Sequence, residues 1–257
     1  LESESEIHGY ILWRDKFEID LAEQVLELGG KIKMNHTIDD LTELADYDYI
    51  VSARGLTILP KLEDVHIGVQ TIAHVKNHPK NRIDLYFGNK IAPKGYGWVL
   101  PLGFKKARVG LGTSLAVKAN PKKLLDSFIE KIEAEPISKV KSKLISTAKP
   151  PRKLTDGNIV LVGDTAYLTD PLTGGGIVQA ILSGKYAAKA IVQGKLEAYD
   201  SYCRGLKRRN LMRYRLKRIL YDFSDEDFNQ MIDAVKDFKP KLTRISWAIA
   251  YAILTLG

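Results

Sequence analysis

Residues 158–188 carry the pattern that most restricts what this chain can fold into. A short apolar run, NIVLVG, ends at Gly163-Asp164, and three consecutive glycines at 174–176 precede an apolar helical pattern. The run predicts a strand that is buried on both faces. A helix is predicted over 177–192, where apolar or small residues recur every three or four positions. Strand, loop and helix in this order indicate an α/β unit, which places ligands at the carboxyl end of its strand.

The loop between that strand and helix contains the residues expected of a ligand site. Asp164 can accept hydrogen bonds from sugar-type hydroxyl groups. The glycines at 174–176 leave backbone N–H groups uncovered at the helix start, so a polar or anionic ligand can approach closely. A glycine-rich loop that only packs a helix onto a sheet is the alternative. That alternative does not explain the whole ordered string of G-D, P-x-x-G-G-G-I and a helix lined with small residues.

The rest of the chain predicts a sheet inserted into an interrupted α/β domain. The elements are expected in this order: a helix over 19–28, a strand over 47–53, an antiparallel sheet of about four strands over 65–115, and a helix from Asn120-Pro121 to about Glu135. Asn120 is suited to cap that last helix and Pro121 to occupy its first position.

A second motif lies within the predicted sheet, where residues 93–101 read PKGYGWVLP. Tyr96 and Trp98 are two positions apart on a strand and therefore share one of its faces. Their rings can line a slot for a long apolar chain, with their polar atoms hydrogen-bonded at its edge. Core packing of the two rings is the alternative on spacing alone.

Together and in this order, the two motifs resemble the geranylgeranyl reductase family, within the flavoprotein superfamily that includes the aromatic hydroxylases. The string from Gly163 to Ile177 resembles the second FAD-binding motif of that superfamily. PKGYGWVLP resembles the family pattern P-x-x-Y-x-W-x-F-P, with Leu100 in place of phenylalanine. The resemblance extends from about Trp13 to Phe238.

The resemblance implies a set of site residues. The implied cofactor-binding residues are Arg14, Gly163, Asp164, Pro171, Gly174, Gly175, Gly176 and Ile177. The implied substrate-binding residues are Tyr96, Trp98 and Pro101. Arg14, in WRDKFEIDLAEQVLELGG, resembles an arginine that faces the cofactor in related flavoproteins, and a surface salt bridge is the alternative. No side chain stands out as a catalytic acid, and no metal site is predicted.

The resemblance also implies an architecture: a partial FAD/NAD(P)-binding Rossmann-like domain with an inserted antiparallel β-sheet and a helical C-terminus. The implied divisions are 1–60 and 149–194 for the FAD-binding domain, 61–148 for the substrate-binding domain and 195–257 for a helical cap. The implied activity is FAD-dependent reduction of C=C bonds in an isoprenoid chain, in membrane-lipid biosynthesis. The electron donor would be NAD(P)H or ferredoxin. Alternatives are a flavin monooxygenase, a quinone-linked dehydrogenase, or a non-catalytic remnant that binds lipid or a partner chain.

Two features depart from the family pattern. The G-x-G-x-x-G turn that would hold the cofactor's pyrophosphate is absent from these 257 residues, so a segment before Leu1 is expected to supply it. In YIVSARG, Ser52 stands where the family has an aspartate, and no role is predicted for it.

Charge and composition bound the partners and the setting. The net charge is +8, and residues 195–218 contain nine basic side chains against two acidic ones. This segment can meet a phosphate-bearing ligand or an anionic membrane surface, or it can be a solvated helix face, and nucleic acid is not expected. A single cysteine, Cys203, indicates a reducing, cytoplasmic setting. The apolar run 245–256 is too short to span a bilayer but could rest on a membrane surface.

Overall fold

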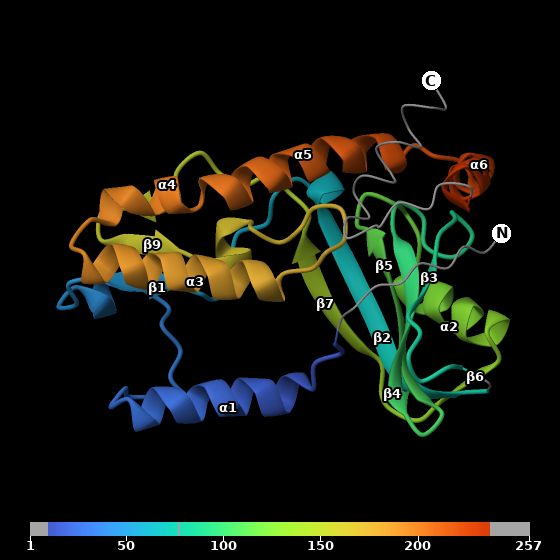
Figure 1. Ribbon diagram of the computed structural model, residues 1–257, viewed down its shortest axis with the longest axis horizontal. Coiled ribbons are helices and arrows are strands. Elements are labelled where there is room, and N and C mark those ends of the chain that lie inside the picture. The colour runs from blue at the N-terminus through green and yellow to red at the C-terminus, as the bar shows by residue number, and fades with distance from the viewer. Residues whose placement is uncertain (1–9, 77, 237–257) are drawn as a thin grey trace.

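The computed structural model describes residues 10–76 and 78–236, in which two β-sheets are joined by long helices (Figure 1). The larger sheet is antiparallel and has six strands. In spatial order they are β3 (Asp84–Tyr86), β4 (Tyr96–Gly103), β5 (Lys106–Ser114), β2 (Val65–Val75) and β6 (Ala134–Pro136), and β7 (Lys141–Ser146) also pairs with β2. The predicted antiparallel sheet is confirmed, and two strands beyond residue 115 extend it.

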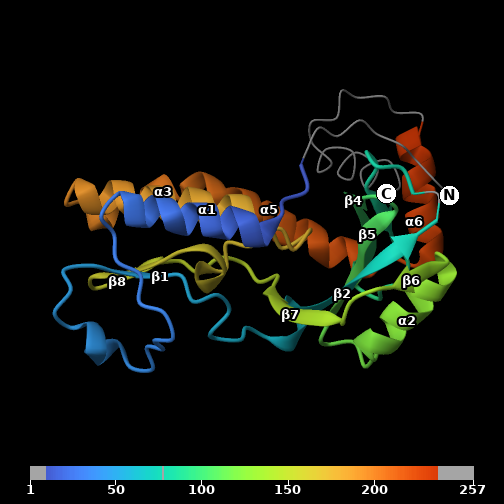
Figure 2. The ribbon, with the colours of Figure 1, turned by 90° about the horizontal axis from the view of Figure 1, so that it is seen from below.

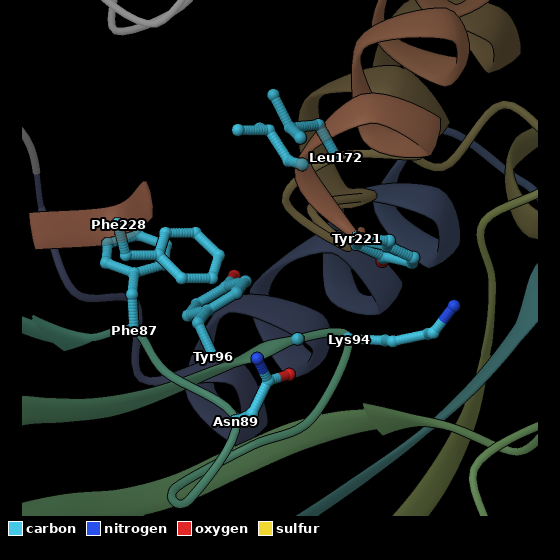
Figure 3. A pocket seen from close by; sticks show the side chains of 9 residues that line it. Phe87, Asn89, Lys94, Tyr96, Leu172, Tyr221 and Phe228 are labelled. Carbon is cyan, nitrogen blue, oxygen red and sulfur yellow. The ribbon is translucent and has the colours of Figure 1, made fainter. Parts of the chain in front are cut away.

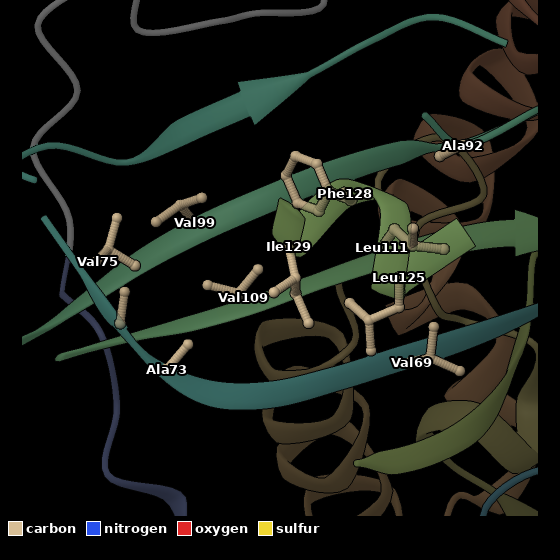
Figure 4. Packing of buried hydrophobic residues seen from close by; sticks show 11 residues of the cluster. Val69, Ala73, Val75, Ala92, Val99, Val109, Leu111, Leu125, Phe128 and Ile129 are labelled. Atoms are coloured by element: carbon tan, nitrogen blue, oxygen red, sulfur yellow. The ribbon is translucent and has the colours of Figure 1, made fainter. Parts of the chain in front are cut away.

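One face of this sheet is covered by α2 (Pro121–Lys131), and together they form the largest core (Figure 4). The helix begins as its sequence predicts, because the Asn120 side chain accepts hydrogen bonds from the Lys122 and Lys123 backbone amides at 3.0 and 3.2 Å. Its apolar residues point at alternate residues of the central strands. The buried core comprises Val69, Ala73, Val75, Ala92, Val99, Ala107, Val109, Leu111, Leu125, Phe128 and Ile129.

The predicted end of this helix is wrong by about four residues. The helix ends at Lys131, Glu133 adopts a positive φ of 50°, and the chain turns back as β6 to pair with β2. Pro136 lacks a backbone N–H and therefore suits this short strand at the sheet edge. The next strand, β7, pairs with the other end of β2, and the sequence analysis predicts no strand in this segment, KSKLIS.

The smaller sheet joins distant parts of the chain. Its strands are β1 (Ile50–Ser52), β9 (Ile159–Leu161) and β8 (Thr155–Asp156), with β1 parallel to β9 and β8 antiparallel to it. The strand predicted near 159–162 is confirmed, although only Val160 of β9 is fully buried. The predicted helix over 177–192 is also confirmed as α3 (Ile177–Val192).

Helices α3, α4 (Tyr199–Tyr202) and α5 (Arg204–Leu220) pack with this sheet around a second core. The core includes Leu154, Val160, Leu168, Tyr199 and Cys203. Helix α5 continues along the molecule to the larger sheet, and the final described helix, α6 (Asp225–Lys236), lies beyond its end (Figures 1 and 2). The mixed α/β architecture with a helical C-terminal part is therefore as predicted.

Helix α1 (Arg14–Glu27) starts five residues before its predicted beginning and buries none of its residues. Figure 1 shows it set apart from both sheets. Gly29, with a φ of +83°, lies just after its end. Within the described ranges, no helix has the length and apolar character needed to cross a membrane. The apolar run 245–256 lies outside the described residues.

Candidate functional site

The strand β9 leads directly into the predicted ligand loop, where Gly163 brings strand and helix close together. Gly163 has a φ of +55°, and a Cβ at this position would lie 3.2 Å from the Ala180 Cβ on α3. Its backbone amide donates to the Ser183 hydroxyl at 3.0 Å. A side chain here would meet both strain and crowding, so glycine is required for this approach.

Asp164 follows at the start of a 3-10 turn, Gly163–Ala166, with one carboxylate oxygen fixed and the other available. Its Oδ1 accepts a hydrogen bond from the Thr169 hydroxyl at 2.7 Å. Its Oδ2 forms a long ion pair with the Lys143 ammonium, at 3.8 Å from the Nζ, and this distance is beyond hydrogen-bonding range. The side chain is 27% exposed. Oδ2 can therefore accept a hydrogen bond from a ligand hydroxyl.

The glycine segment after Asp164 comes close to that carboxylate and opens α3. A Cβ on Gly176 would lie 2.9 Å from the Asp164 Oδ1, and Gly174 has a φ of +69°. Gly176 is the N-cap of α3, and no side chain caps the helix. The first amides of α3 are thus open to a ligand beside the free oxygen of Asp164.

Buried groups from α5 hold this loop in place. Asp170 accepts from the backbone amides of Leu172 and Thr173 at 3.0 and 3.3 Å and forms an ion pair with Arg213. Asn210 donates to the carbonyls of Leu168 and Thr169 at 2.8 and 3.0 Å. The sequence analysis missed both supports, since nothing in the basic helix indicates which of its side chains turn inward.

In the larger sheet, Tyr96 and Trp98 share one face of β4, as predicted, with ring centroids 5.8 Å apart in an edge-on arrangement. The indole of Trp98 lies over glycines of the neighbouring strands. A Cβ on Gly110 would come within 2.7 Å of that ring, whereas one on Gly112 would remain 3.8 Å away. The Trp98 Nε1 is buried and has no hydrogen-bond partner among the described residues. This N–H is a donor that a ligand could use.

The Tyr96 hydroxyl joins the two motifs, because it donates to the backbone carbonyl of Thr173 in the glycine segment. Burial raises the pKa of Tyr96 to about 12, so the phenol stays protonated and the bond persists at neutral pH. The structure thus brings the predicted substrate-facing strand against the predicted cofactor loop.

A small cavity of about 40 Å³ adjoins this contact (Figure 3). Most of its wall is aromatic or aliphatic, and the strand β4, the glycine loop and helices α5 and α6 all contribute. The lining residues are Phe87, Asn89, Lys94, Gly95, Tyr96, Leu172, Leu220, Tyr221 and Phe228. The sequence analysis identified Tyr96 alone among them. Lys94, Gly95 and Leu172 lie within the two motifs but were given no role, and the other lining residues come from segments without a motif.

Two predicted site residues lie elsewhere. Pro101 is half-buried at an irregularity of β4 and does not line the cavity. Arg14 is paired with Glu18 one turn later on α1, and the side chains are 54% and 55% exposed. The surface ion pair considered for Arg14 is therefore present, while a cofactor contact by Arg14 stays a prediction.

The basic segment 195–218 is not a uniform solvated face. Three of its cations turn inward and form ion pairs: Lys207 with Asp200, Arg213 with Asp170 and Lys217 with Asp64. The Nε and Nη2 atoms of Arg209 are buried as well. Other cations remain exposed, and Arg215 and Arg218 line an open groove at the end of α5. Cys203 is buried at the junction of α4 and α5, and burial raises the pKa of its thiol.

Comparison with known proteins agrees with this arrangement. Residues 64–148, which contain the larger sheet and α2, match the family described as "Geranylgeranyl reductase catalytic domain". The digeranylgeranylglycerophospholipid reductase of Methanosphaerula palustris is 34% identical over 89% of this chain and 68% of its own length. The chain belongs to the geranylgeranyl reductase family.

Other relatives and solved structures extend the comparison. The family member named digeranylgeranylglycerophospholipid reductase 2 in Methanococcoides burtonii is 34% identical over 89% of this chain. The chain spans only 66% of that relative's length and 48% of the Methanocella arvoryzae relative's. A geranylgeranyl bacteriochlorophyll reductase-like protein from Thermoplasma acidophilum superposes with a TM-score of 0.81, at 27% identity, over 98% of this chain and 74% of its own. A flavin-dependent brominase shares the fold alone. It superposes with a TM-score of 0.61, at 15% identity, over 95% of this chain and 75% of its own.

Proposed function

We propose that this chain is part of an FAD-dependent oxidoreductase that reduces C=C bonds in the isoprenoid chain of a membrane lipid. The observation that carries the proposal is the hydrogen bond from Tyr96 to Thr173, which places an aromatic cavity against the glycine loop. The names of the relatives support an isoprenoid lipid as substrate. The chain spans 48% and 66% of the lengths of two such relatives, so the whole reaction stays a proposal for it.

The residues of the loop fit FAD. Asp164 keeps one oxygen free for a hydroxyl of the ribityl chain, and the bare amides at the start of α3 can approach the flavin ring. The close approach of Gly176 to Asp164 leaves no room for a side chain between them. Pro171 and Gly174 to Ile177 complete the proposed contact, with Arg14 as a further one. FAD would supply the hydride, after reduction by NAD(P)H or ferredoxin.

The cavity suits part of an apolar chain. Phe87, Leu172 and Phe228 give it an apolar wall, and about 40 Å³ leaves room for one small group of a ligand. Trp98 and Pro101 remain proposed substrate contacts farther along β4. Arg215 and Arg218, in the open groove beyond Tyr221, are suited to a lipid phosphate. We also propose the domain divisions given above and a cytoplasmic location with peripheral membrane contact.

The proposal is tested in two stages. The chain is purified, alone and together with any residues that precede Leu1, and its bound flavin is measured by absorbance before and after adding FAD. The flavin is then reduced without oxygen, and a geranylgeranyl lipid is added. We expect the flavin to be reoxidised while C=C bonds of the lipid are reduced. A product that forms only with oxygen would instead identify a monooxygenase, and a protein that binds lipid but no flavin would identify a non-catalytic remnant.

A further inference from the structure

A line of buried hydrogen bonds starts at α5 and ends at the aromatic cavity. The Lys217 ammonium donates to the Asp64 carboxylate at 2.7 Å, to the Thr147 carbonyl at 3.0 Å and to the Thr147 hydroxyl at 3.2 Å. The side chains of Lys217 and Asp64 are only 3% and 11% exposed. Thr147 follows strand β7 and is buried as well. A proton source is therefore held inside the protein rather than at its surface.

His66, on β2, continues this line toward the cavity. Its Nδ1 lies 3.1 Å from the Thr147 hydroxyl, and its Nε2 lies 2.8 Å from the Lys94 carbonyl and 2.7 Å from the Tyr221 hydroxyl. A carbonyl oxygen can only accept, so the hydrogen of the neutral ring is assigned to Nε2. Nδ1 then accepts from the Thr147 hydroxyl, which in turn accepts from Lys217.

The one Nε2 hydrogen then serves both the Lys94 carbonyl and the Tyr221 oxygen as a bifurcated bond, so the line from Lys217 runs toward Tyr221. Because Nε2 carries the hydrogen, the hydroxyl hydrogen of Tyr221 is not directed at His66. Tyr221 lines the cavity together with Tyr96 and Leu172. The Tyr96 hydroxyl is already committed to the Thr173 carbonyl. Of these two phenols, Tyr221 is the one that can give a proton to a group in the cavity.

We propose that Tyr221 donates the proton in the reduction of the C=C bond. A proton passed from Lys217 through Thr147 and His66 then restores the Tyr221 hydroxyl. This inference rests on the proposed function. The π bond would break as one carbon received a hydride, which a bound, reduced flavin would supply, and the other received the hydroxyl proton of Tyr221. Two C–H bonds form, and the reaction consumes one hydride and one proton.

The proton lost by Tyr221 is replaced along the hydrogen bonds. The Tyr221 oxygen regains a proton from the His66 Nε2, Nδ1 takes one from the Thr147 hydroxyl, and that hydroxyl takes one from Lys217. Lys217 is left as a neutral amine until solvent reprotonates it. Burial lowers the pKa of Lys217, which makes its proton easier to give. Burial also raises the pKa of Tyr221 and lowers that of His66 to about 4, so both groups are neutral before each transfer.

A second inward-turned lysine shows what a purely structural cluster looks like in this protein. Lys207 donates to Asp200 at 2.6 Å and to the Arg152 carbonyl at 2.7 Å, while Asp200 accepts from the Leu154 amide at 3.1 Å. None of these four residues lines the aromatic cavity. The line from Lys217 differs because it ends at Tyr221, a residue that lines the cavity.

The decisive experiment follows the reoxidation of pre-reduced flavin by a geranylgeranyl lipid, without oxygen, in a single turnover. General acids typically contribute about 10²–10⁴-fold, so Tyr221→Phe should slow this step by about 100-fold or more. Reduction of the flavin by the electron donor should not change, because no proton is passed to the substrate in that half-reaction. Thr147→Val should also slow reoxidation, because it breaks the line between Lys217 and His66.

Tyr202→Phe is the matched control. Tyr202 is also a half-buried phenol of the C-terminal helices, and its hydroxyl donates to Gln193 at 2.8 Å, away from the cavity. This variant should reoxidise like the wild type. Nitrogen NMR of His66 gives a second readout that is independent of activity, with the hydrogen expected on Nε2 and Nδ1 as acceptor.

The possible failures are distinguishable. If Tyr221→Phe reoxidises as fast as Tyr202→Phe, or if NMR places the hydrogen on Nδ1, the relay is wrong while the proposed function stands. If lipid does not reoxidise the wild-type flavin at all, the proposed function is rejected, and the proton transfer to the lipid is rejected with it.

Discussion

The Tyr96 hydroxyl donates a 2.5 Å hydrogen bond to the backbone carbonyl of Thr173, a residue 77 positions later in the chain. One partner is the first residue of β4 in the larger sheet, and the other belongs to the loop that opens α3. This contact fixes the distance between the aromatic face of β4 and the glycine segment. Substrate and cofactor contacts would therefore meet at one place.

Removing this hydroxyl should loosen the glycine segment. In Tyr96→Phe we expect a loss of about 1 kcal/mol in the free energy of unfolding, the usual net contribution of one hydrogen bond. Backbone amides of residues 172–176 should also exchange faster with deuterated solvent. Tyr202→Phe, which removes a phenol hydrogen bond elsewhere, should leave that exchange unchanged. Equal exchange in both variants would show that the contact does not hold the loop.

Two glycines beneath Trp98 should differ sharply in their tolerance of alanine. The new Cβ in Gly110→Ala would lie 2.7 Å from both the Trp98 ring and the Gln70 Cβ, so the ring must shift. We expect about 1–3 kcal/mol of destabilisation in urea unfolding, with altered tryptophan fluorescence. Gly112→Ala adds the same group with a nearest contact of 3.8 Å and should change stability much less. Similar losses in both variants would contradict this account of the indole's position.

Asp164 should determine cofactor affinity without determining the fold. Asp164→Asn keeps the size of the side chain but removes its charge, and hydrogen bonds to charged groups contribute about 1.5–3 kcal/mol. We expect FAD affinity to fall by roughly tenfold or more, measured by quenching of flavin fluorescence. Asp156→Asn makes the same change at an exposed position of β8 and should bind FAD like the wild type. Unchanged affinity in Asp164→Asn would remove this residue from the site.

His66 should make stability fall in mild acid. Burial first, and the Lys217 charge to a lesser degree, hold the pKa of His66 at about 4, whereas an unfolded histidine titrates near its ordinary value of 6.5. The unfolded state therefore binds more protons between these values, so this group's stabilisation is complete above pH 6.5 and is lost as pH falls toward 4. The loss can reach about 3 kcal/mol.

Urea unfolding at several pH values measures this effect. His66→Gln should flatten the dependence of the unfolding free energy on pH within that window. His36→Gln, at an exposed position, should keep the wild-type slope. Parallel curves for the wild type and His66→Gln would mean that the ring is not buried in its neutral form.

Local signals account for the parts of the fold that the sequence predicts well. Asn120 caps α2 and the glycines open α3, and each acts through neighbouring backbone groups. The errors concern partners that are distant in sequence. Strands β6 and β7 exist because β2 pairs with both, and nothing in the polar segment that contains them shows that pairing.

The same limit applies to the site. The glycine loop and the PKGYGWVLP strand are continuous motifs, so they could be found from residues alone. Tyr221 and His66 lie 155 positions apart and meet only after folding. The inward turn of Lys217 and Arg213 could not be predicted either, because a run of basic residues on a helix looks the same whether a cation faces solvent or a buried carboxylate.

The most direct test of the central claim is the absorbance spectrum of the purified protein, taken with any residues that precede Leu1 and after incubation with FAD. Our account predicts tightly bound flavin in the wild type and much weaker binding in Asp164→Asn. A folded, colourless wild-type protein that takes up no FAD would contradict it, because the loop from Asp164 to Gly176 would then serve some other ligand or none.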